Sequence, residues 1–318
     1  MIDISKRKLI AIVGPTATGK SNVAIELAKR IDGEIISADS MQIYKGMDIG
    51  TAKVTPDEMN GIPHHLIDII SPAEPFSVAE YQKLARRLID EISERGKIPI
   101  LVGGTGLYVR SVIDKLEFPS GEISSKVRRQ LEQRAKLEGS EVLYKELIEK
   151  DPKAAEIVHP NNVRRIIRAL EIIELTGKPF SYYHSEWKSR ESIYDLAIFG
   201  LTMDRKLLYE RIDRRVDKMI EAGLIDEVKE LQSKGYEKFL TSQQAIGYKE
   251  LIRYLKGESS LEEAIDIIKS RTRQYAKRQL TWFRADPRIK WIDVTRKTPA
   301  EVADEIINEL KKRQFIIV

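Results

Sequence analysis

Residues 14–21, GPTATGKS, restrict the possible fold of this chain more than any other segment. They match the pattern Gly-x-x-x-x-Gly-Lys-Ser/Thr. An apolar run rich in β-branched residues precedes them at 8–14, and apolar residues at helical spacing follow at 21–31. A strand, a loop and a helix in this order form a phosphate-binding loop, because glycine lets the backbone turn its N–H groups inward and the helix N-terminus adds positive potential. The segment therefore predicts a site for a diphosphate or a triphosphate.

The rest of the chain alternates between strand and helix patterns. Buried strands are predicted at 33–40, 97–106 and 196–203, a last strand at 290–295, and a helix at 78–96. Near-continuous apolar strands joined by helices form parallel sheets that are covered on both faces. We therefore predict an α/β fold with a P-loop NTPase-like, doubly wound parallel sheet and with ligands at the carboxyl ends of its strands.

The middle of the chain has a different character. From about 122 to 190 it is charged and helical, without an apolar run typical of a buried strand. A length of 318 residues suits two domains, or one domain with an insertion. We predict a P-loop core whose first part is 1–121, a mainly helical insertion domain at 122–192, and a completion of the core with C-terminal helices at 193–318.

Composition excludes several classes of protein. The chain has no cysteine, which rules out disulfide frameworks, thiolate zinc sites and cysteine nucleophiles. His64 and His65 are adjacent, whereas helical metal ligands are spaced by four residues, so we expect no metal site there. The short N-terminal apolar run does not suit a signal peptide, and no segment approaches the roughly 18 apolar residues of a membrane span. We expect a cytoplasmic protein that does not enter a membrane.

The phosphate-binding loop supplies the first candidate site residues. We expect phosphate to be bound by Gly14, Pro15, Thr16, Ala17, Thr18, Gly19, Lys20 and Ser21. Lys20 contributes a cation, and the Ser21 hydroxyl suits a Mg²⁺ ion, the cofactor that we predict. A usual P-loop ATPase carries an acidic residue after a later strand to orient magnesium, but the strand at 97–106 ends in Gly-Gly-Thr-Gly. This disfavours an ATPase, while a small-molecule kinase remains an alternative.

A carboxylate and a hydroxyl follow two of the predicted strands. Asp39 lies at the end of the strand at 33–40, on the sheet edge that carries the phosphate-binding loop in this topology. A strand end gives a side chain fixed reach, which a general base needs before it needs a shifted pKa. Asp39 is therefore our candidate base, with capping of the next turn or contact with magnesium through water as its alternatives. Thr105, in the second glycine loop, suits a hydrogen bond to the acceptor substrate or ordinary turn chemistry.

Positive charge is unevenly distributed along the chain. The net charge is +5, but residues 271–290 hold seven Lys or Arg and one acid. Aromatic residues lie among these cations, and that combination suits RNA, because phosphates take the charge and unstacked bases take the rings. Arginines also lie off the apolar stripe of a predicted helix at 161–173, and four cations share one face of a helix at 211–218. Solvated, salt-bridged surfaces are the alternative for all three segments.

Several motifs follow one another in an order typical of one family. They are GPTATGKS at 14–21, ISADSMQIYKGMDIGTAK at 36–53, HHLIDI at 64–69, LVGGTGLY at 101–108, NNVRRIIRALEI at 161–172, AIGYKE at 245–250 and RQLTWFR at 278–284. They span nearly the whole chain, which resembles the bacterial tRNA dimethylallyltransferase (tRNA isopentenyltransferase) family. The resemblance implies transfer of a dimethylallyl group from dimethylallyl diphosphate to the exocyclic N6 amine of the adenosine 3′-adjacent to the tRNA anticodon, position 37. The phosphate-binding loop would then hold the leaving diphosphate, and ATP would not be consumed.

The resemblance also implies roles for individual residues. Asp39 would take the proton of the amine, Thr105 would orient the amine, and Lys20 would stabilise the leaving diphosphate. Either Arg214 or Arg215 would reach the diphosphate, and we favour Arg215. The tRNA anticodon stem-loop would be bound by Asp39, Ser40, Met41, Gln42, Thr105, Arg128, Asn161, Asn162, Arg164, Arg165, Gln244, Gly247, Lys277, Arg278, Gln279 and Trp282. The insertion domain would grip the stem, and we expect the chain to act as a monomer.

Three rival functions remain open on the sequence alone. A small-molecule kinase explains the phosphate-binding loop and Asp39 but leaves the insertion and the basic C-terminal segment without a role. An RNA-binding regulator with a residual nucleotide site has no need of Asp39 together with Thr105. Prenylation of free adenine nucleotides is a closer rival, and the long insertion with its Asn-Asn-Arg-Arg helix favours an RNA acceptor.

Overall fold

The computed structural model describes residues 6–118, 125–186, 189–239 and 244–316. The chain divides into two compact units, the first comprising Met1–Ile113 with Ile193–Val318 and the second Asp114–Ser192. The insertion therefore begins at Asp114, eight residues before the start that we predicted from composition. The reason is that the helix ending at Ile113 still packs on the sheet of the first unit, whereas the residues after it do not belong to that core.

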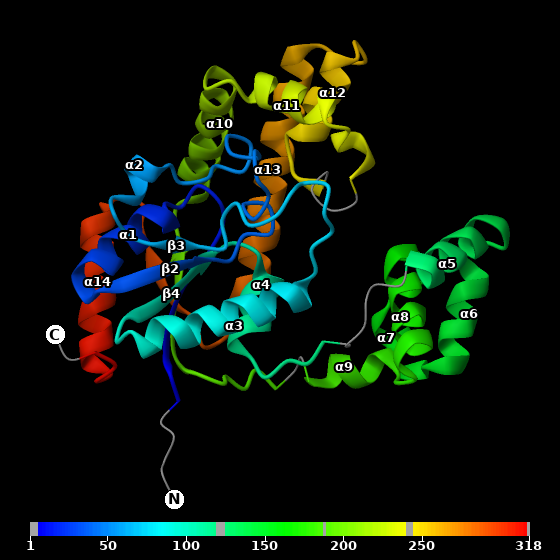
Figure 1. The fold of residues 1–318 in the computed structure, drawn as a ribbon, viewed down its shortest axis with the longest axis horizontal. Helices are drawn as coiled ribbons and strands as arrows, with labels where there is room; N and C mark the ends of the chain where they lie inside the picture. Colours follow the sequence, from blue (N-terminus) through cyan, green and yellow to red (C-terminus); the bar gives the residue numbers. More distant parts are fainter. Residues whose placement is uncertain (1–5, 119–124, 187–188, 240–243, 317–318) are drawn as a thin grey trace, which may run out of the picture. The chain divides into compact units, whose positions relative to one another are not determined.

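A parallel sheet forms the centre of the first unit (Figure 1). Its strands are β1 (Lys8–Val13), β2 (Gly33–Ser37), β3 (His64–His65), β4 (Ile98–Gly103), β5 (Asp195–Thr202) and β6 (Lys290–Asp293), in the spatial order β3-β2-β4-β1-β5-β6. Every pair of neighbouring strands is parallel. The doubly wound sheet is thus confirmed, as are the predicted strands, and the short β3 is an addition that the sequence pattern did not indicate.

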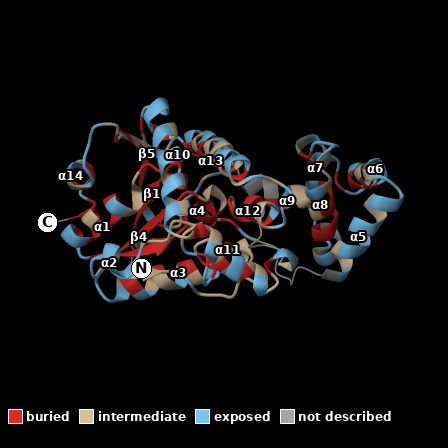
Figure 2. Ribbon diagram, turned by 90° about the horizontal axis from the view of Figure 1, so that it is seen from above, coloured by how far each residue is buried: buried red, intermediate tan, exposed pale blue. Residues whose placement is uncertain are grey.

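Helices cover both faces of this sheet. The helices of the first unit are α1 (Lys20–Ile31), α2 (Pro56–Met59), α3 (Val78–Glu94), α4 (Gly106–Ile113), α10 (Arg205–Glu221), α11 (Leu224–Ser233), α12 (Tyr248–Leu255), α13 (Leu261–Arg284) and α14 (Pro299–Lys312), with a 3-10 turn η1 at Tyr236–Lys238. Ile10 and Ile12 of β1 pack with α1, α10 and α14, whereas Leu9, Ala11 and Val13 pack with α3 and α4. Because both faces are buried, β1 reads as a continuous apolar run, and Figure 2 shows β1 and β4 in the colour of buried residues.

A separate helical cluster belongs to the first unit and packs on the loop that follows β2. Ile43, Tyr44 and Met47 of that loop are buried against Val228 of α11 and Tyr248 of α12. Parallel strands place the loops after β1, β2 and β4 at one edge of the sheet. The helical cluster therefore fixes one of the three loops that meet at this edge.

The described residues of the second unit form helices joined by turns, together with an isolated bridge between Asp114 and Ser192. Its helices are α5 (Ser125–Leu137), α6 (Ser140–Lys150), α7 (Pro152–Ile157), α8 (Val163–Thr176) and α9 (Phe180–Glu186). The predicted stripe of α8 is confirmed, since Ile166, Ile167 and Leu170 are buried in the core of this unit. None of the helices described in either unit is long and apolar enough to cross a bilayer.

A buried carboxylate joins β2, β3 and the turn after α3. Glu34 on β2 accepts hydrogen bonds from His65 Nε2 at 2.8 Å and from Arg95 Nη2 at 2.7 Å. Burial by itself would raise the pKa of Glu34, but the hydrogen bonds from His65 and Arg95 outweigh burial and lower the pKa. Glu34 therefore stabilises the fold in its charged form.

Replacing Glu34 with Gln should lower the free energy of unfolding by about 1–3 kcal/mol at pH 7, because two charge-assisted hydrogen bonds are weakened. The folded-state pKa lies below the unfolded one, so this stabilisation is present above about pH 4.5 and is lost as the pH falls through the folded-state value. Urea denaturation at pH 7, 5, 4 and 3 measures the effect. Glu94→Gln, which breaks an exposed pair with Arg7, is the control and should cost less than about 0.5 kcal/mol. Equal costs for the two variants would contradict the prediction.

Candidate active site

A pocket of about 300 Å³ lies where the loops after β1, β2 and β4 meet. It is lined by Thr16, Lys20, Ser21, Asn22, Asp39, Gln42, Thr51, Ala52, Lys53, Val54, Glu58, Val102, Gly103, Gly104, Arg215, Tyr275 and Gln279. All of these residues belong to the first unit. The pocket therefore brings together the phosphate-binding loop, the predicted base Asp39 and the second glycine loop.

The phosphate-binding loop runs from the end of β1 into α1. Gly14 has a φ of 138°, and a side chain on it would meet the carbonyl oxygen of Leu201 at 2.5 Å, so the turn requires glycine. The Thr18 hydroxyl closes the loop by donating to the Pro15 carbonyl at 2.9 Å. Gly19 carries no side chain that could cap α1, which leaves the first N–H groups of the helix available to an anion.

Two of the basic residues that line the pocket, Lys20 and Arg215, contact the phosphate-binding loop. The Lys20 ammonium donates to the Pro15 carbonyl at 2.8 Å, and the Arg215 guanidinium donates to the Thr16 hydroxyl at 3.3 Å. Burial, with a smaller contribution from the nearby Arg215, lowers the pKa of Lys20 to about 7, although Asp39 opposes the shift. Burial also lowers the pKa of Arg215. Each cation is thus poorly solvated, and both would be favoured by an anion between them.

The predicted base lies on the floor of the same pocket. Asp39 Oδ1 accepts a hydrogen bond from the Met41 N–H at 2.9 Å, which fixes the carboxylate after the end of β2. Burial raises the pKa of Asp39, and the Met41 N–H and Lys20 oppose the rise. A raised pKa makes the carboxylate a stronger proton acceptor, and such a shift is typical of a general base.

Thr105, which follows β4, contacts the residues on either side of Asp39. Its Oγ accepts a hydrogen bond from the Ser40 N–H at 3.2 Å, and its own N–H donates to the Ala38 carbonyl at 3.2 Å. The loops after β2 and β4 are therefore joined by hydrogen bonds. Through Asp39, Gln42 and Gly104 these loops form one wall of the pocket, and Thr105 follows directly after Gly104 without lining the pocket itself.

Helix α13 forms another wall and contributes residues that sequence reasoning did not assign to a catalytic site. Tyr275 lines the pocket, and burial raises the pKa of its hydroxyl to about 12, while hydrogen bonds with Thr105 and Gln279 oppose the rise. Gln279, which we predicted to bind RNA, also lines the pocket. Their spacing of four residues places both on one helix face, and that spacing is the signal that could have found Tyr275.

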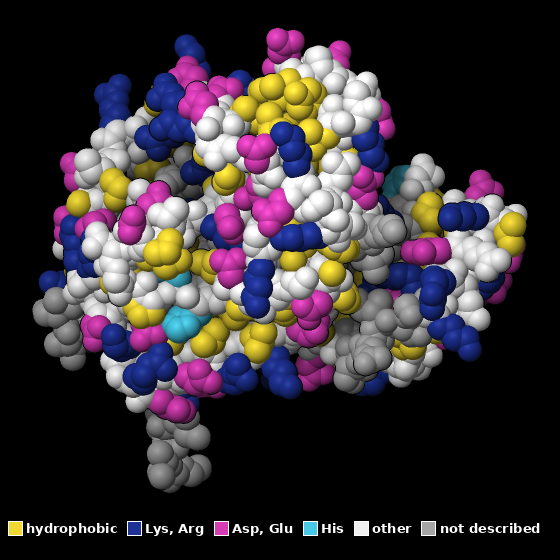
Figure 3. Space-filling view, turned by 45° about the horizontal axis from the view of Figure 1, so that its top comes forward, with side chains coloured by type: hydrophobic (Ala, Val, Ile, Leu, Met, Phe, Trp, Pro, Cys, Tyr) yellow, Lys and Arg dark blue, Asp and Glu magenta, His cyan; other side chains and the backbone are white. Residues whose placement is uncertain are grey.

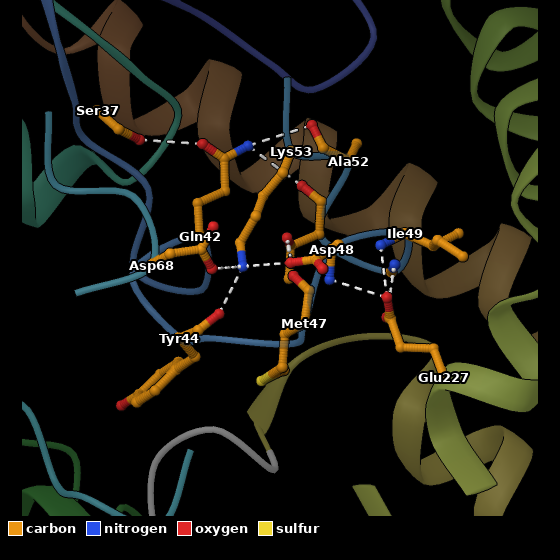
Figure 4. A network of polar contacts seen from close by, with 12 residues as sticks. Ser37, Gln42, Tyr44, Met47, Asp48, Ile49, Ala52, Lys53, Asp68 and Glu227 are labelled. Carbon is orange, nitrogen blue, oxygen red and sulfur yellow. Dashed lines mark hydrogen bonds and ion pairs between the residues drawn. The ribbon is translucent and has the colours of Figure 1, made fainter. Parts of the chain in front are cut away.

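The loop after β2 is held by the polar network shown in Figure 4. Gln42 donates to the carbonyls of Thr51 and Ala52 at 3.2 and 3.3 Å. Lys53 donates to Asp48 at 2.6 Å and also pairs with Asp68. Of the predicted RNA-binding residues here, Ser40 and Gln42 therefore make contacts within the chain in this structure, and Gln42 and Lys53 line the pocket.

Glu227 of α11 anchors the middle of that loop, a role that no pattern in the sequence indicated. Its carboxylate accepts hydrogen bonds from the N–H groups of Asp48, Ile49 and Gly50 at 2.9, 2.7 and 3.1 Å (Figure 4). It also accepts one from the Tyr248 hydroxyl at 2.6 Å. Glu227 thus ties the loop after β2 to α11 and α12.

Arg214 and Arg215, either of which could bind the diphosphate on the sequence alone, lie on different faces of helix α10. Arg215 lines the pocket, whereas Arg214 is exposed, together with Arg211 and Lys218. The acidic residues of this segment of α10 face α13. Asp213 pairs with Arg273 at 2.5 Å and Asp217 pairs with Lys269 at 2.6 Å, and both partners belong to α13. Arg215 is therefore the arginine that can reach a ligand in the pocket.

Much of the charge of the basic segment at 271–290 is neutralised within the chain. Arg271 pairs with Glu250, Arg273 with Asp213, Arg288 with Asp286 and Lys290 with Glu309. Within the described parts of the chain, Lys277, Arg278 and Arg284 are exposed and form no ion pair. Figure 3 shows basic and acidic side chains interspersed over the visible face. The basic surface of α13 is thus smaller than the sequence suggested, and Trp282, 41% exposed, lies on it.

The remaining predicted RNA-binding residues lie outside the pocket. In the second unit, Asn161, Asn162, Arg164 and Arg165 are exposed at the start of α8, where Asn162 caps the helix by accepting from the Arg165 N–H at 3.2 Å. Arg128 and Arg168 both donate to the buried carboxylate of Glu171, at 3.0 and 2.7 Å. In the first unit, Gln244 is exposed, whereas Gly247 is buried and donates to Glu250 at 2.8 Å.

The pocket has few ligands of its own for a metal ion. No group of three or more His, Asp or Glu side chains that could hold a metal occurs among the residues that the structure describes. Ser21, on the first turn of α1, is the residue that we predicted for Mg²⁺, and it lines the pocket. Mg²⁺ in phosphate sites keeps several waters and is bound largely by substrate phosphates, so a single hydroxyl fits this ion when a diphosphate is present.

The chain is similar to known proteins over nearly its whole length. Residues 42–286 match the model of the IPP transferase family. A tRNA dimethylallyltransferase from Carboxydothermus hydrogenoformans is 57% identical over 97% of this chain and 99% of its own length. Among solved structures, a tRNA isopentenylpyrophosphate transferase from Bacillus halodurans has a TM-score of 0.71 at 52% identity, covering 97% of this chain and 98% of that chain. A eukaryotic dimethylallyltransferase acting on tRNA has a TM-score of 0.83 at 33% identity, covering 97% of this chain and 80% of that chain.

The lowered pKa of Lys20 predicts that binding of pyrophosphate depends on pH. An anion favours the charged lysine, so the pKa must be higher in the complex than the value of about 7 in the free protein. Above pH 7, binding should therefore take up a proton, and Kd should rise by up to about tenfold per pH unit. Calorimetry between pH 6.5 and 9, in buffers of different ionisation enthalpy, measures both quantities. Lys20→Met is the control for the titration of pyrophosphate itself, and equal pH slopes for the two proteins would contradict the assignment.

Proposed function

The chain belongs to the IPP transferase family, and from this premise we propose that it transfers a dimethylallyl group from dimethylallyl diphosphate to the N6 amine of the tRNA adenosine 3′-adjacent to the anticodon. Its relatives over nearly the full length are named tRNA dimethylallyltransferases. The observation that carries the chemistry is the juxtaposition of two poorly solvated cations, Lys20 and Arg215, with the carboxylate of Asp39 in one pocket. The cations suit a diphosphate, and the carboxylate suits a proton acceptor.

The donor side of the reaction is the phosphate-binding loop. The bond that breaks joins the first carbon of the dimethylallyl group to a diphosphate oxygen, so negative charge accumulates on the leaving diphosphate. Lys20, Arg215 and the free N–H groups at the start of α1 hold that charge. They bind it more strongly in the transition state than in the ground state, and this difference accelerates the reaction.

The acceptor side is the wall formed by the loops after β2 and β4. The bond that forms joins N6 of adenine to the first carbon of the dimethylallyl group. An adenine amine is a weak nucleophile, because its lone pair is delocalised into the ring, so removal of its proton during attack lowers the barrier. Asp39 accepts that proton and Thr105 orients the amine. The adenosine leaves its stack to reach this wall, at a cost of a few kcal/mol.

Magnesium fits the donor side. When bound to the diphosphate, Mg²⁺ would neutralise part of the charge that develops on the leaving group. Ser21 is the residue of this chain that would hold it through its hydroxyl, and the remaining ligands would come from the diphosphate and from water. The carboxylate of Asp39 is then left to take up the proton of the amine.

A kinase acting on a small molecule is less well supported. Phosphoryl transfer from ATP depends on an acidic residue that orients magnesium, and β4 is followed by Gly104 and Thr105 at the position where the sequence of a usual P-loop ATPase has an acid. The relatives named above also transfer dimethylallyl groups rather than phosphate.

The pocket residues Lys20, Asp39 and Arg215 all come from one chain, so the proposed reaction needs no second subunit. We place the reaction, together with its RNA substrate, in the cytoplasm.

Binding of the RNA is assigned to exposed residues of both units. In the first unit these are Lys277, Arg278 and Trp282 of α13, and in the second unit Asn161 and Arg165 at the start of α8. Cations bind the phosphates, and an exposed aromatic ring offers a stacking surface to an unpaired base. Each unit thus presents exposed polar or basic side chains for an RNA, and the presence of the second unit favours an RNA acceptor over a free nucleotide.

The first test of this proposal is incubation of unmodified tRNA with the protein, Mg²⁺ and dimethylallyl diphosphate, without ATP, followed by digestion and mass spectrometry. We expect a C5H8 addition on the adenosine beside the anticodon. Asp39→Asn should lower the single-turnover rate by about 100-fold or more, because the proton acceptor is lost. The tRNA Kd of this variant should stay within about twofold of the wild type. No adduct with the wild type would overturn the proposed function, and equal losses of rate and affinity in Asp39→Asn would overturn the assignment of the base.

Replacing Arg278 with Ala should weaken tRNA binding and reduce the slope of log Kd against log salt concentration by about one, because one phosphate contact is lost. Arg273→Ala is the matched control on the same helix. Because Arg273 pairs with Asp213, this replacement should leave the slope unchanged. Filter binding between 50 and 300 mM salt measures both slopes. An unchanged slope for Arg278→Ala would remove this residue from the phosphate contacts.

A further inference from the structure

The side chain of Gln279 joins the two loops on which the proposed reaction depends. Its Oε1 accepts a hydrogen bond from the Thr16 N–H of the phosphate-binding loop at 2.8 Å. Its Nε2 donates to the Gly104 carbonyl of the second glycine loop at 3.0 Å. The residue is only 5% exposed, so water does not compete for these hydrogen bonds.

The backbone of the second glycine loop is shaped to admit this contact. A side chain at Gly104 would place its Cβ at 2.1 Å from Gln279 Nε2, and one at Gly106 would meet the ring of Trp282 at 2.1 Å. Helix α13 therefore lies directly against the backbone of the loop, and only glycine permits that approach. The contact also explains why the strand end carries glycine where an ATPase sequence has an acid.

The sheet does not fix the distance between these loops by itself. The last paired residues of β1 and β4 are Val13 and Gly103. Thr16 lies three residues beyond the end of the pairing, in the loop that holds the leaving diphosphate. Gly104 is bonded to Thr105, which orients the acceptor amine. Beyond the strand ends, the Gln279 amide is thus a direct link between the donor side and the acceptor side.

We propose that Gln279 is a positioning residue that sets the distance between the leaving diphosphate and the adenine amine. This inference rests on the proposed function and adds a residue to it. Transfer of the dimethylallyl group needs the amine, the carbon and the leaving oxygen in line, and an error of about 1 Å in such an arrangement costs a large part of the rate. A two-point hydrogen bond between the loops supplies that precision, since Gln carries an acceptor and a donor on one rigid amide.

A contact between Gln279 and RNA is the alternative, and the structure disfavours it. The amide oxygen and nitrogen are both engaged within the chain, and the residue is buried. Its neighbours Lys277 and Arg278 are exposed and suit RNA instead. The two roles predict opposite phenotypes, because loss of an RNA contact changes affinity and loss of positioning changes the rate at saturation.

The test is Gln279→Met, which keeps the length of the side chain and removes both hydrogen bonds. With enzyme in excess over tRNA and at saturating enzyme and dimethylallyl diphosphate, the single-turnover rate constant should fall at least about tenfold, while the tRNA Kd stays within about twofold. At saturating enzyme the rate constant does not depend on how much of the protein is folded, and circular dichroism of the variant reports the folded fraction. Gln274→Met, at an exposed position of the same helix, is the matched control and should match the wild type. An unchanged rate constant, or a weakened tRNA Kd with the rate intact, would overturn the proposal.

A double variant tests the contact with Gly104. Gly104→Ala should lower the rate constant by displacing the Gln279 side chain, and Gly104→Ala combined with Gln279→Ala should be no slower than Gln279→Ala alone. Additive losses would contradict this coupling.

Hydrogen exchange of the Thr16 N–H, followed by NMR, provides a measurement that does not need activity. It should be at least about tenfold faster in Gln279→Met than in the wild type, with the Val23 N–H of α1 unchanged. If the wild type formed no prenylated product, the proposed function would fail. The exchange rate alone would then decide whether Gln279 joins the loops, and an unchanged rate would overturn the inference.

Discussion

The parallel pairing of β2 with β4, of β4 with β1 and of β1 with β5 in one continuous sheet is the constraint on which the site depends. Val13 is in register with Gly103 on one side and with Gly200 on the other. Because parallel strands point the same way, the loops that follow β1, β2 and β4 must begin at one edge of the sheet. The phosphate-binding loop and the loop that carries Asp39 therefore start at the same edge, with the loop after β4 between them, and α13 completes the pocket.

Burial in the pocket shifts the pKa values of the charged residues that the proposed reaction uses. The pocket holds Lys20 and Arg215 in surroundings that lower the pKa of both, and it holds Asp39 in surroundings that raise its pKa. Burial is the largest cause in all three cases, so each group is less stable in its charged form than it would be in water. An anionic leaving group relieves the cost for the two cations. Proton transfer relieves it for the carboxylate, so the protein is prepared for both halves of a substitution reaction.

The basic side chains discussed above are of two kinds, those paired with acidic residues and those exposed to solvent. Arg273 and Lys290 carry charges that other elements neutralise, and they stabilise the packing of α13 on α10 and of β6 beside α14. Lys277 and Arg278 remain exposed, and these are the charges available to a polyanion. Local net charge therefore overstated the RNA-binding surface, because an ion pair between distant segments is invisible in a window of twenty residues. The same holds for Arg128, which donates to Glu171.

The sequence alone determined the features that depend on local patterns. Apolar runs and glycine spacing predicted the strands, the phosphate-binding loop and the helical second unit, and strand ends predicted that Asp39, Thr105 and Lys20 would meet. Tertiary structure decided the contacts between residues far apart in the chain. Gln279 meets Thr16 across 263 residues, Glu227 meets the loop at Asp48, and Arg215 rather than Arg214 faces the pocket. Periodicity defines the face of a helix to within a residue or so. Which neighbour that face meets depends on the packing of the whole unit, and no local pattern records that packing.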